Sequence, residues 1–83
     1  MVFSWDAKKA AANIKKHSVD FTEAATVVND SLSTTYPDMD HSILLEPRFI
    51  TIGMSSRKRI LVVVHTEDNN NFRIISARRA TPS

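Results

Sequence analysis

The 83-residue sequence contains no cysteine and a single glycine, and these two absences remove several classes of protein at once. Without cysteine there is no disulfide framework of the kind that stabilises small secreted domains, and no thiolate metal site. One glycine, Gly53, cannot build a glycine-rich phosphate loop, which excludes the usual nucleoside-triphosphate chemistry. A chain this short forms one domain and buries a modest share of its surface, so a stabilising partner is expected.

Long apolar segments are also missing. The longest apolar run, Ile60–Val64, has the length of a strand and is far too short to span a membrane. The N-terminal residues lack the apolar segment of a signal peptide. We therefore expect a cytoplasmic protein with no membrane contact.

Charged residues are unevenly distributed, although the net charge is only +2. From Arg48 onward there are seven basic residues, six of them arginine, against Glu67 and Asp68. The planar guanidinium group suits phosphate, so this half of the chain fits RNA or an acidic protein partner. Charge alone does not separate these two readings from a solvated strand face.

The residue pattern predicts one α+β domain, residues 1–83, with two N-terminal helices packed on a mostly antiparallel sheet. Asp6 and Asp20 are expected to cap the two helices, with Glu23 completing a capping box with Asp20. The expected order is β-α-α-β-β-β-β, over Phe3–Trp5, Ala7–His17, Phe21–Val28, Leu32–Tyr36, Arg48–Met54, Arg59–Glu67 and Phe72–Arg79.

Periodicity also predicts which faces are buried. The expected buried residues of the two helices are Ala7, Ala10, Ala11 and Ile14, then Phe21, Ala24, Ala25 and Val28. In the strand Arg59–Glu67, alternation places residues 60, 62, 64 and 66 on an apolar face that we expect to pack on the helices.

The opposite face of that strand carries His65 and Glu67 as neighbours, a candidate acid–base couple. The alternative is a strand-end histidine beside a solvated glutamate. In the last strand, alternation places Arg73 and Arg79 on one face and Arg78 on the other, unless a bulge intervenes. A cross-strand ion pair with Glu67 is the structural alternative for Arg73.

Metal chemistry has little support in the sequence. The three histidines, His17, His41 and His65, are widely separated. Asp38, Asp40 and His41 form the one conceivable ligand set, and a solvated acidic loop is the simpler interpretation of it. We expect no metal and no cofactor.

Three segments of the sequence resemble the BrnT family. FSWDAKKAAANIKKHSVDFTEAATVVND resembles its opening, with an aromatic-x-Trp-Asp start, a histidine before the turn and a Phe-x-Glu-Ala second helix. RFITIGMSSRKRILVVVHTE and FRIISARRAT resemble its sheet hairpin and its closing strand. The segments follow one another in order, with the Asp-x-Asp-His residues 38–41 between them, so the resemblance covers essentially the whole chain.

The resemblance implies a type II toxin with a fold similar to the RelE ribonucleases, which inhibits translation by cutting RNA. It also implies a BrnA-like antitoxin that neutralises the toxin in a hetero-oligomer and contacts operator DNA, so that DNA is bound only through the antitoxin. Family members usually continue into a charged C-terminal helix. We expect residues 1–83 to form the toxin domain without that helix.

Metal-independent RNA cleavage needs a base for the 2′-hydroxyl proton, a cation at the phosphate and an acid for the leaving oxygen. The expected catalytic residues are His65, Glu67, Arg59, Arg73 and Arg78, the last two belonging to the closing motif of the family. The expected RNA-binding residues are Arg57, Lys58, Arg79, Lys15 and His17. The alternatives are a non-catalytic antitoxin-binding partner and an RNA-binding domain that act in operon autorepression.

Overall fold

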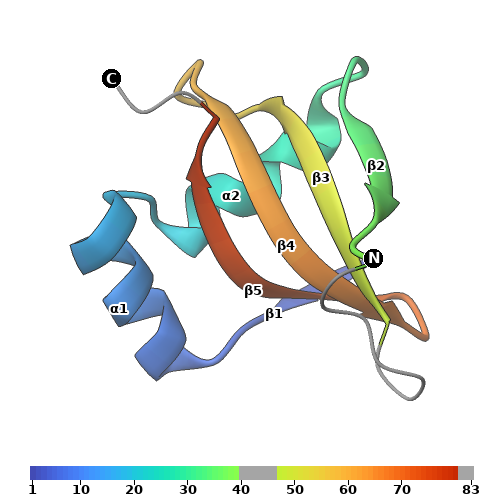
Figure 1. The fold of residues 1–83 in the computed structure, drawn as a ribbon, viewed down its shortest axis with the longest axis horizontal. Helices are drawn as coiled ribbons and strands as arrows, with labels where there is room; N and C mark the ends of the chain where they lie inside the picture. The colour runs from blue at the N-terminus through green and yellow to red at the C-terminus, as the bar shows by residue number, and fades with distance from the viewer. Residues whose placement is uncertain (40–46, 81–83) are drawn as a thin grey trace.

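The computed structural model describes residues 1–39 and 47–80 (Figure 1). The described elements follow the predicted order, with one short 3₁₀ helix, η1, added after the second helix. None of the described helices has both the length and the apolar character needed to cross a membrane. The elements are β1 (Val2–Ser4), α1 (Ala7–His17), α2 (Phe21–Ala25), η1 (Thr26–Asn29), β2 (Thr34–Pro37), β3 (Arg48–Met54), β4 (Ile60–Asp68) and β5 (Asn71–Arg79).

The strands form one mixed sheet in the order β1-β5-β4-β3-β2. Strands β2 to β5 are antiparallel neighbours, as the short connections predict, and β1 adds a parallel strand along β5. The parallel pairing arises because the chain leaves β1 through both helices before it enters the rest of the sheet. The prediction of a mostly antiparallel sheet is therefore confirmed.

Both α-helices pack on the same face of the sheet (Figure 1), and the core lies between them and the central strands. On β4 this buried face carries Leu61 and Val63, so the prediction that residues 60, 62, 64 and 66 face the helices is wrong. Both faces of β4 carry apolar side chains, so the alternation within β4 does not predict which face packs on the helices. The orientation is determined by β5, because burial of its Phe72 and Ile74 requires them to face the helices. The buried core residues are Val19, Phe21, Ala24, Val27, Leu61, Val63, Phe72, Ile74 and Ala77.

Helix α1 begins where predicted, because the carboxylate of Asp6 accepts hydrogen bonds from the backbone of Lys8 and Lys9. Its buried face differs from the prediction. Asn13 is its one buried residue, whereas Ile14 is 47% exposed. Asn13 is buried because its side-chain amide bonds to the β5 backbone. Of the four residues predicted to be buried, Ala10 packs against the core, whereas Ala7, Ala11 and Ile14 are exposed.

The second helical segment is shorter than predicted as an α-helix. Helix α2 ends at Ala25, and η1 continues to Asn29 with three residues per turn. This tighter winding places Val27, three residues after Ala24, in the core and leaves Val28 only half-buried. Asp20 caps α2 as predicted, but Glu23 does not close a capping box, because its carboxylate bonds to Ser55 and Arg59.

Candidate active site

Three segments that are distant in the sequence meet at one end of the sheet. The turn between β3 and β4 touches the end of α1, where the Arg59 guanidinium donates to the carbonyl of Ser18 at 3.1 Å. The end of β5 lies beside the start of β4, where Ala80 N donates to the Ile60 carbonyl at 2.9 Å. We call the seven cationic or titratable residues gathered there the basic end: Lys15, Lys16, His17, Arg57, Lys58, Arg78 and Arg79.

Helix α1 is fixed to β5 by Asn13. Its Nδ2 donates to the carbonyls of Val19 and Ala77 at 3.0 and 2.8 Å, and its Oδ1 accepts from Ala77 N at 3.1 Å. Strand β1 pairs only with Asn71 to Arg73, so among the described residues no strand borders the edge of β5 at Ala77. The side-chain amide supplies the missing donor and acceptor, and this fixes the last turn of α1 next to Arg78 and Arg79.

The basic turn of residues 55–59 is held by the buried carboxylate of Glu23. Its Oε2 accepts from Ser55 Oγ at 2.6 Å and from Arg59 Nε at 3.0 Å, and its Oε1 accepts from Arg59 Nη2. The bonds from Arg59 hold the pKa of Glu23 below its usual value, and they raise the pKa of Arg59. The guanidinium predicted to be catalytic is thus engaged in a bidentate ion pair inside the fold.

Arg57 and Lys58 stand at the exposed tip of the same turn. The side chain of Arg57 is 73% exposed and reaches within only 4.0 Å of Glu23. Lys58 has a left-handed backbone conformation with φ 61°, and its N–H donates to the Ser55 carbonyl at 2.9 Å. Hydrogen bonds hold the turn in place while its two outer cations face solvent, an arrangement suited to binding phosphate.

A β-bulge decides which way the arginines of β5 point. The pairing with β4 shifts between Val64, opposite Ser76, and His65, opposite Ile74, so that Ile75 is the extra residue. Arg73 and Arg78 consequently share the face away from the helices, which corrects the simple alternation that separated them. Arg79, opposite Leu61, lies on the helix side, so its predicted separation from Arg78 is confirmed.

His65 lies in the core. Its ring is 0% exposed and stacks between Phe72 and Phe49, at centroid distances of 3.8 and 6.0 Å. Its Nε2 is 2.7 Å from Thr51 Oγ1, and its Nδ1 is 3.5 Å from Glu67 Oε2. Burial lowers the pKa of His65 from 6.5 to about 4. The predicted neighbourhood of His65 and Glu67 is confirmed, but the ring has no contact with solvent.

Arg73 lies at the far end of β5 from the basic end. It is opposite Thr66 on β4, so its side chain and that of Glu67 point to opposite faces, which rules out the alternative of an ion pair between them. Its charge contributes to the lowered pKa of Asp6, although the backbone N–H groups of Lys9 and Lys8 are the larger causes. The five residues predicted to be catalytic are therefore distributed over both ends and both faces of the sheet.

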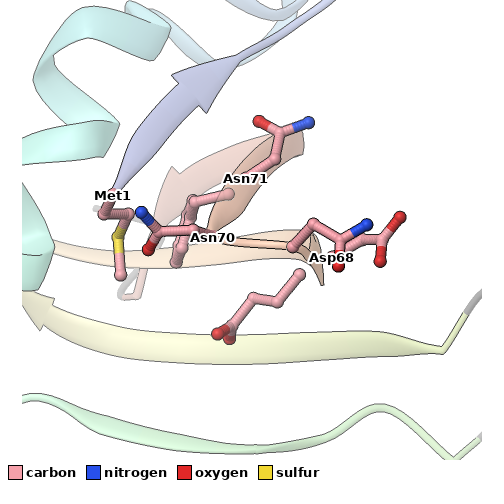
Figure 2. Close-up of a pocket in the computed structure, with 7 residues that line it drawn as sticks. Met1, Asp68, Asn70 and Asn71 are labelled. Atoms are coloured by element: carbon pink, nitrogen blue, oxygen red, sulfur yellow. The ribbon is translucent and has the colours of Figure 1, made fainter.

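Two of the surface pockets lie outside the basic end. One, of about 190 Å³, lies between Met1 and the β4–β5 hairpin (Figure 2) and is lined by Glu67, Asp68 and three asparagines. Its carboxylates disfavour a phosphate. The other, of about 320 Å³, borders the basic turn at Ser55 and Ser56 and also contains Asp30. Within residues 1–39 and 47–80 no three histidine, aspartate or glutamate side chains gather as a metal site requires. Asp40 and His41 lie outside the described residues.

Sequence reasoning missed two residues that shape this end of the sheet, Glu23 and Asn13. Glu23 lies among buried apolar residues of α2, next to Ala24, and a carboxylate in such a position requires a cationic partner. That position was the one available signal, and it did not identify Arg59. Asn13 gave no signal of its own, because its partner is backbone.

Comparison with known proteins gives a family and a fold. Residues 5–83 match the family model described as the ribonuclease toxin BrnT of type II toxin–antitoxin systems. The structure is similar to the crystal structure of the Brucella abortus ribonuclease toxin BrnT, with a TM-score of 0.74 and 22% sequence identity over 99% of this chain and 100% of that chain. No curated protein matches the chain.

Proposed function

Because the chain belongs to the BrnT family of ribonuclease toxins, we propose that it is a metal-independent endoribonuclease whose RNA site is the basic end. The observation that carries this placement is the convergence of α1, the β3–β4 turn and β5 on one exposed cluster of cations. A single-stranded RNA that crosses this end meets a cation from each segment. Its affinity should therefore depend steeply on salt.

The chemistry proposed is transphosphorylation. The 2′-oxygen attacks the adjacent phosphorus, the bond from phosphorus to the 5′-oxygen breaks, and the products are a 2′,3′-cyclic phosphate and a 5′-hydroxyl. The 2′-hydroxyl proton passes to a base, and an acid protonates the leaving 5′-oxygen. Arginine and lysine stabilise the charge that develops on the phosphate oxygens.

Arg78 and Arg57 are the proposed phosphate ligands, with Lys58, Arg79 and Lys15 along the RNA path. The proposed proton-transfer group is His17, which is half-exposed at the end of α1, within the basic end. Histidine is the side chain that most often fills this role. His65 and Arg59 act on the site indirectly in this proposal, because one packs the core and the other holds the basic turn.

The decisive experiment incubates the purified protein with RNA in the presence of EDTA. Fragments that end in 2′,3′-cyclic phosphate are expected, and His17→Ala should reduce their rate of formation by about 100-fold or more. Unbroken RNA would refute the proposal. Fragments that appear only when a divalent cation is added would refute its metal independence.

A second candidate function is a non-catalytic toxin homologue that binds its antitoxin for operon autorepression. The burial of His65 favours it, because this removes one of the predicted acid–base groups from the surface. The same incubation separates the two, since the non-catalytic protein leaves RNA intact while it still binds the antitoxin.

A further inference from the structure

The face of the sheet opposite α1 and α2 is covered by no described helix, and we call it the open face (Figure 1). Antiparallel register places directly opposed residues on the same side of a sheet, so the pairs of Met54 with Ile60 and of Ile50 with Tyr36 mark this face. Its centre is apolar. The residues that form it are Tyr36, Ile50, Ile52, Met54, Ile60, Val62 and Val64.

These apolar side chains are accessible to a partner. Tyr36 is 42% exposed, and Met54 and Ile60 are each 45% exposed, while Ile50, Ile52 and Val64 between them are half-buried and Val62 is buried. Contiguous exposed apolar surface across three adjacent strands is a mark of a protein-binding site rather than of an ordinary solvated face. A single exposed isoleucine would carry no such meaning.

Charge at the border of this face limits what can cover it. The bulge at Ile75 turns both Arg73 and Arg78 onto the open face, where they flank the apolar centre along β5 as exposed residues. A partner that covers the apolar residues must approach both guanidinium groups. Carboxylates on the partner complement them, and lysines or arginines there would be repelled.

The backbone of this face also limits the form of the partner. Backbone N–H and C=O groups lie in the plane of a sheet, and β3 and β4 have a paired strand on both sides, so the open face offers side chains only. An added strand binds through backbone groups at a sheet edge, whereas an amphipathic helix binds through side chains laid on a surface. The open face therefore suits a helix.

We propose that the open face is the docking surface for the antitoxin, and that the docked segment is an acidic amphipathic helix. Its apolar side packs on Met54, Ile60 and Tyr36, and its carboxylates lie at Arg73 and Arg78. This proposal rests on the proposed function and on the antitoxin partner that a type II toxin implies. Docking there covers Arg78, which belongs to the basic end, so the antitoxin excludes RNA from the site that it neutralises.

The experiment measures the affinity of the purified protein for a BrnA-like antitoxin, together with RNA cleavage in EDTA. The test variant is the double substitution Met54→Gln and Ile60→Gln, which removes apolar contacts and adds no charge near the basic end. The matched control is Ile14→Gln, because Ile14 is 47% exposed on α1, on the other side of the sheet. Thermal unfolding confirms that both proteins are folded.

The double variant should bind the antitoxin about 30-fold more weakly, as expected for the loss of two interface residues, and should cleave RNA within about twofold of the wild-type rate. Ile14→Gln should bind like wild type. The double variant should then still cleave RNA at antitoxin concentrations that fully inhibit the wild-type protein.

Unchanged antitoxin affinity in the double variant overturns the docking surface and leaves the proposed function intact. If the double variant loses RNA cleavage but keeps its antitoxin affinity, the docking proposal is overturned, and the open face is assigned to RNA instead. A wild-type dimer that the double variant converts to a monomer, again with unchanged affinity, assigns the face to a second copy of the chain. If the wild-type protein cleaves no RNA, the proposed function fails independently of the binding result.

Discussion

Both carboxylate oxygens of Glu23 accept hydrogen bonds from the guanidinium group of Arg59, and this ion pair fastens the basic turn to α2. The carboxylate is buried, with a side chain only 5% exposed, whereas Arg59 retains 25% exposure. Ser55 fills the remaining bonding capacity of the same carboxylate. A buried ion pair whose polar atoms are all hydrogen-bonded adds little net stability, but it fixes the position of the turn. Removal of one partner leaves the other charge without compensation.

Glu23→Gln should therefore lower the free energy of unfolding by about 3 kcal/mol, because the Arg59 guanidinium loses its counter-ion. Urea denaturation at pH 7 measures the change. The control is Glu67→Gln, at a 44% exposed glutamate, which should change stability by less than about 0.5 kcal/mol. Equal effects of the two substitutions would contradict a structural role for the Glu23–Arg59 pair.

Lys15 and Lys8 provide a matched pair on α1, one at the basic end and one at the opposite end of the helix. Both are exposed, and alanine preserves the helix at either position. Lys15→Ala should reduce the slope of log affinity for RNA against log salt by about 0.7, the loss of one phosphate contact to a single strand. Lys8→Ala should leave the slope unchanged. Fluorescence anisotropy with labelled RNA at several salt concentrations measures both slopes.

If Lys8→Ala reduces the salt slope as much as Lys15→Ala does, the RNA is not confined to the basic end.

The buried ring of His65 predicts sensitivity to acid. Its pKa is lowered to about 4 in the folded protein, from 6.5 in the free side chain, so the unfolded chain binds more protons between these values. Stability is therefore fully present above pH 6.5 and falls as the pH drops toward 4. Between pH 7 and pH 5 the loss from this group should be about 2 kcal/mol, measured by urea denaturation at each pH.

His65→Phe provides the control, because phenylalanine can stack between Phe49 and Phe72 and does not titrate. The loss between pH 7 and pH 5 should nearly disappear in this variant. A variant as acid-sensitive as the wild-type protein would assign the titration to another group.

The amide of Asn13 makes three hydrogen bonds, of which two join α1 to β5 at Ala77 and one reaches the carbonyl of Val19. Asn13→Ala leaves the buried backbone groups at Ala77 without partners and should lower the free energy of unfolding by about 3 kcal/mol. Hydrogen exchange at the Ala77 amide should become faster. Asn29→Ala, at an exposed asparagine, is the control and should have little effect on either measurement. Unchanged protection of the Ala77 amide in Asn13→Ala would contradict this role of Asn13.

Local patterns in the sequence were sufficient for the elements and for the family. Asp6 and Asp20 cap the helices as predicted, because a capping carboxylate acts on backbone two or three residues away. The strands follow β-branched runs bounded by turns, and the family resemblance, which depends on residue order alone, is confirmed over residues 5–83. The caps, the strands and the family can therefore be predicted without knowing which distant residues are in contact in the fold.

Only the tertiary structure decided which faces are buried and which cations meet. The apolar run of β4 is compatible with helices on either side, and the packing of Phe72 and Ile74 on β5 makes the choice. The bulge at Ile75 arises from pairing between strands, and it alone aligns Arg73 with Arg78. Burial likewise removes His65 from the surface, while long-range bonds bring Arg59 to Glu23 and Asn13 to Ala77. Each of these outcomes depends on contacts between residues far apart in the chain, which periodicity cannot encode.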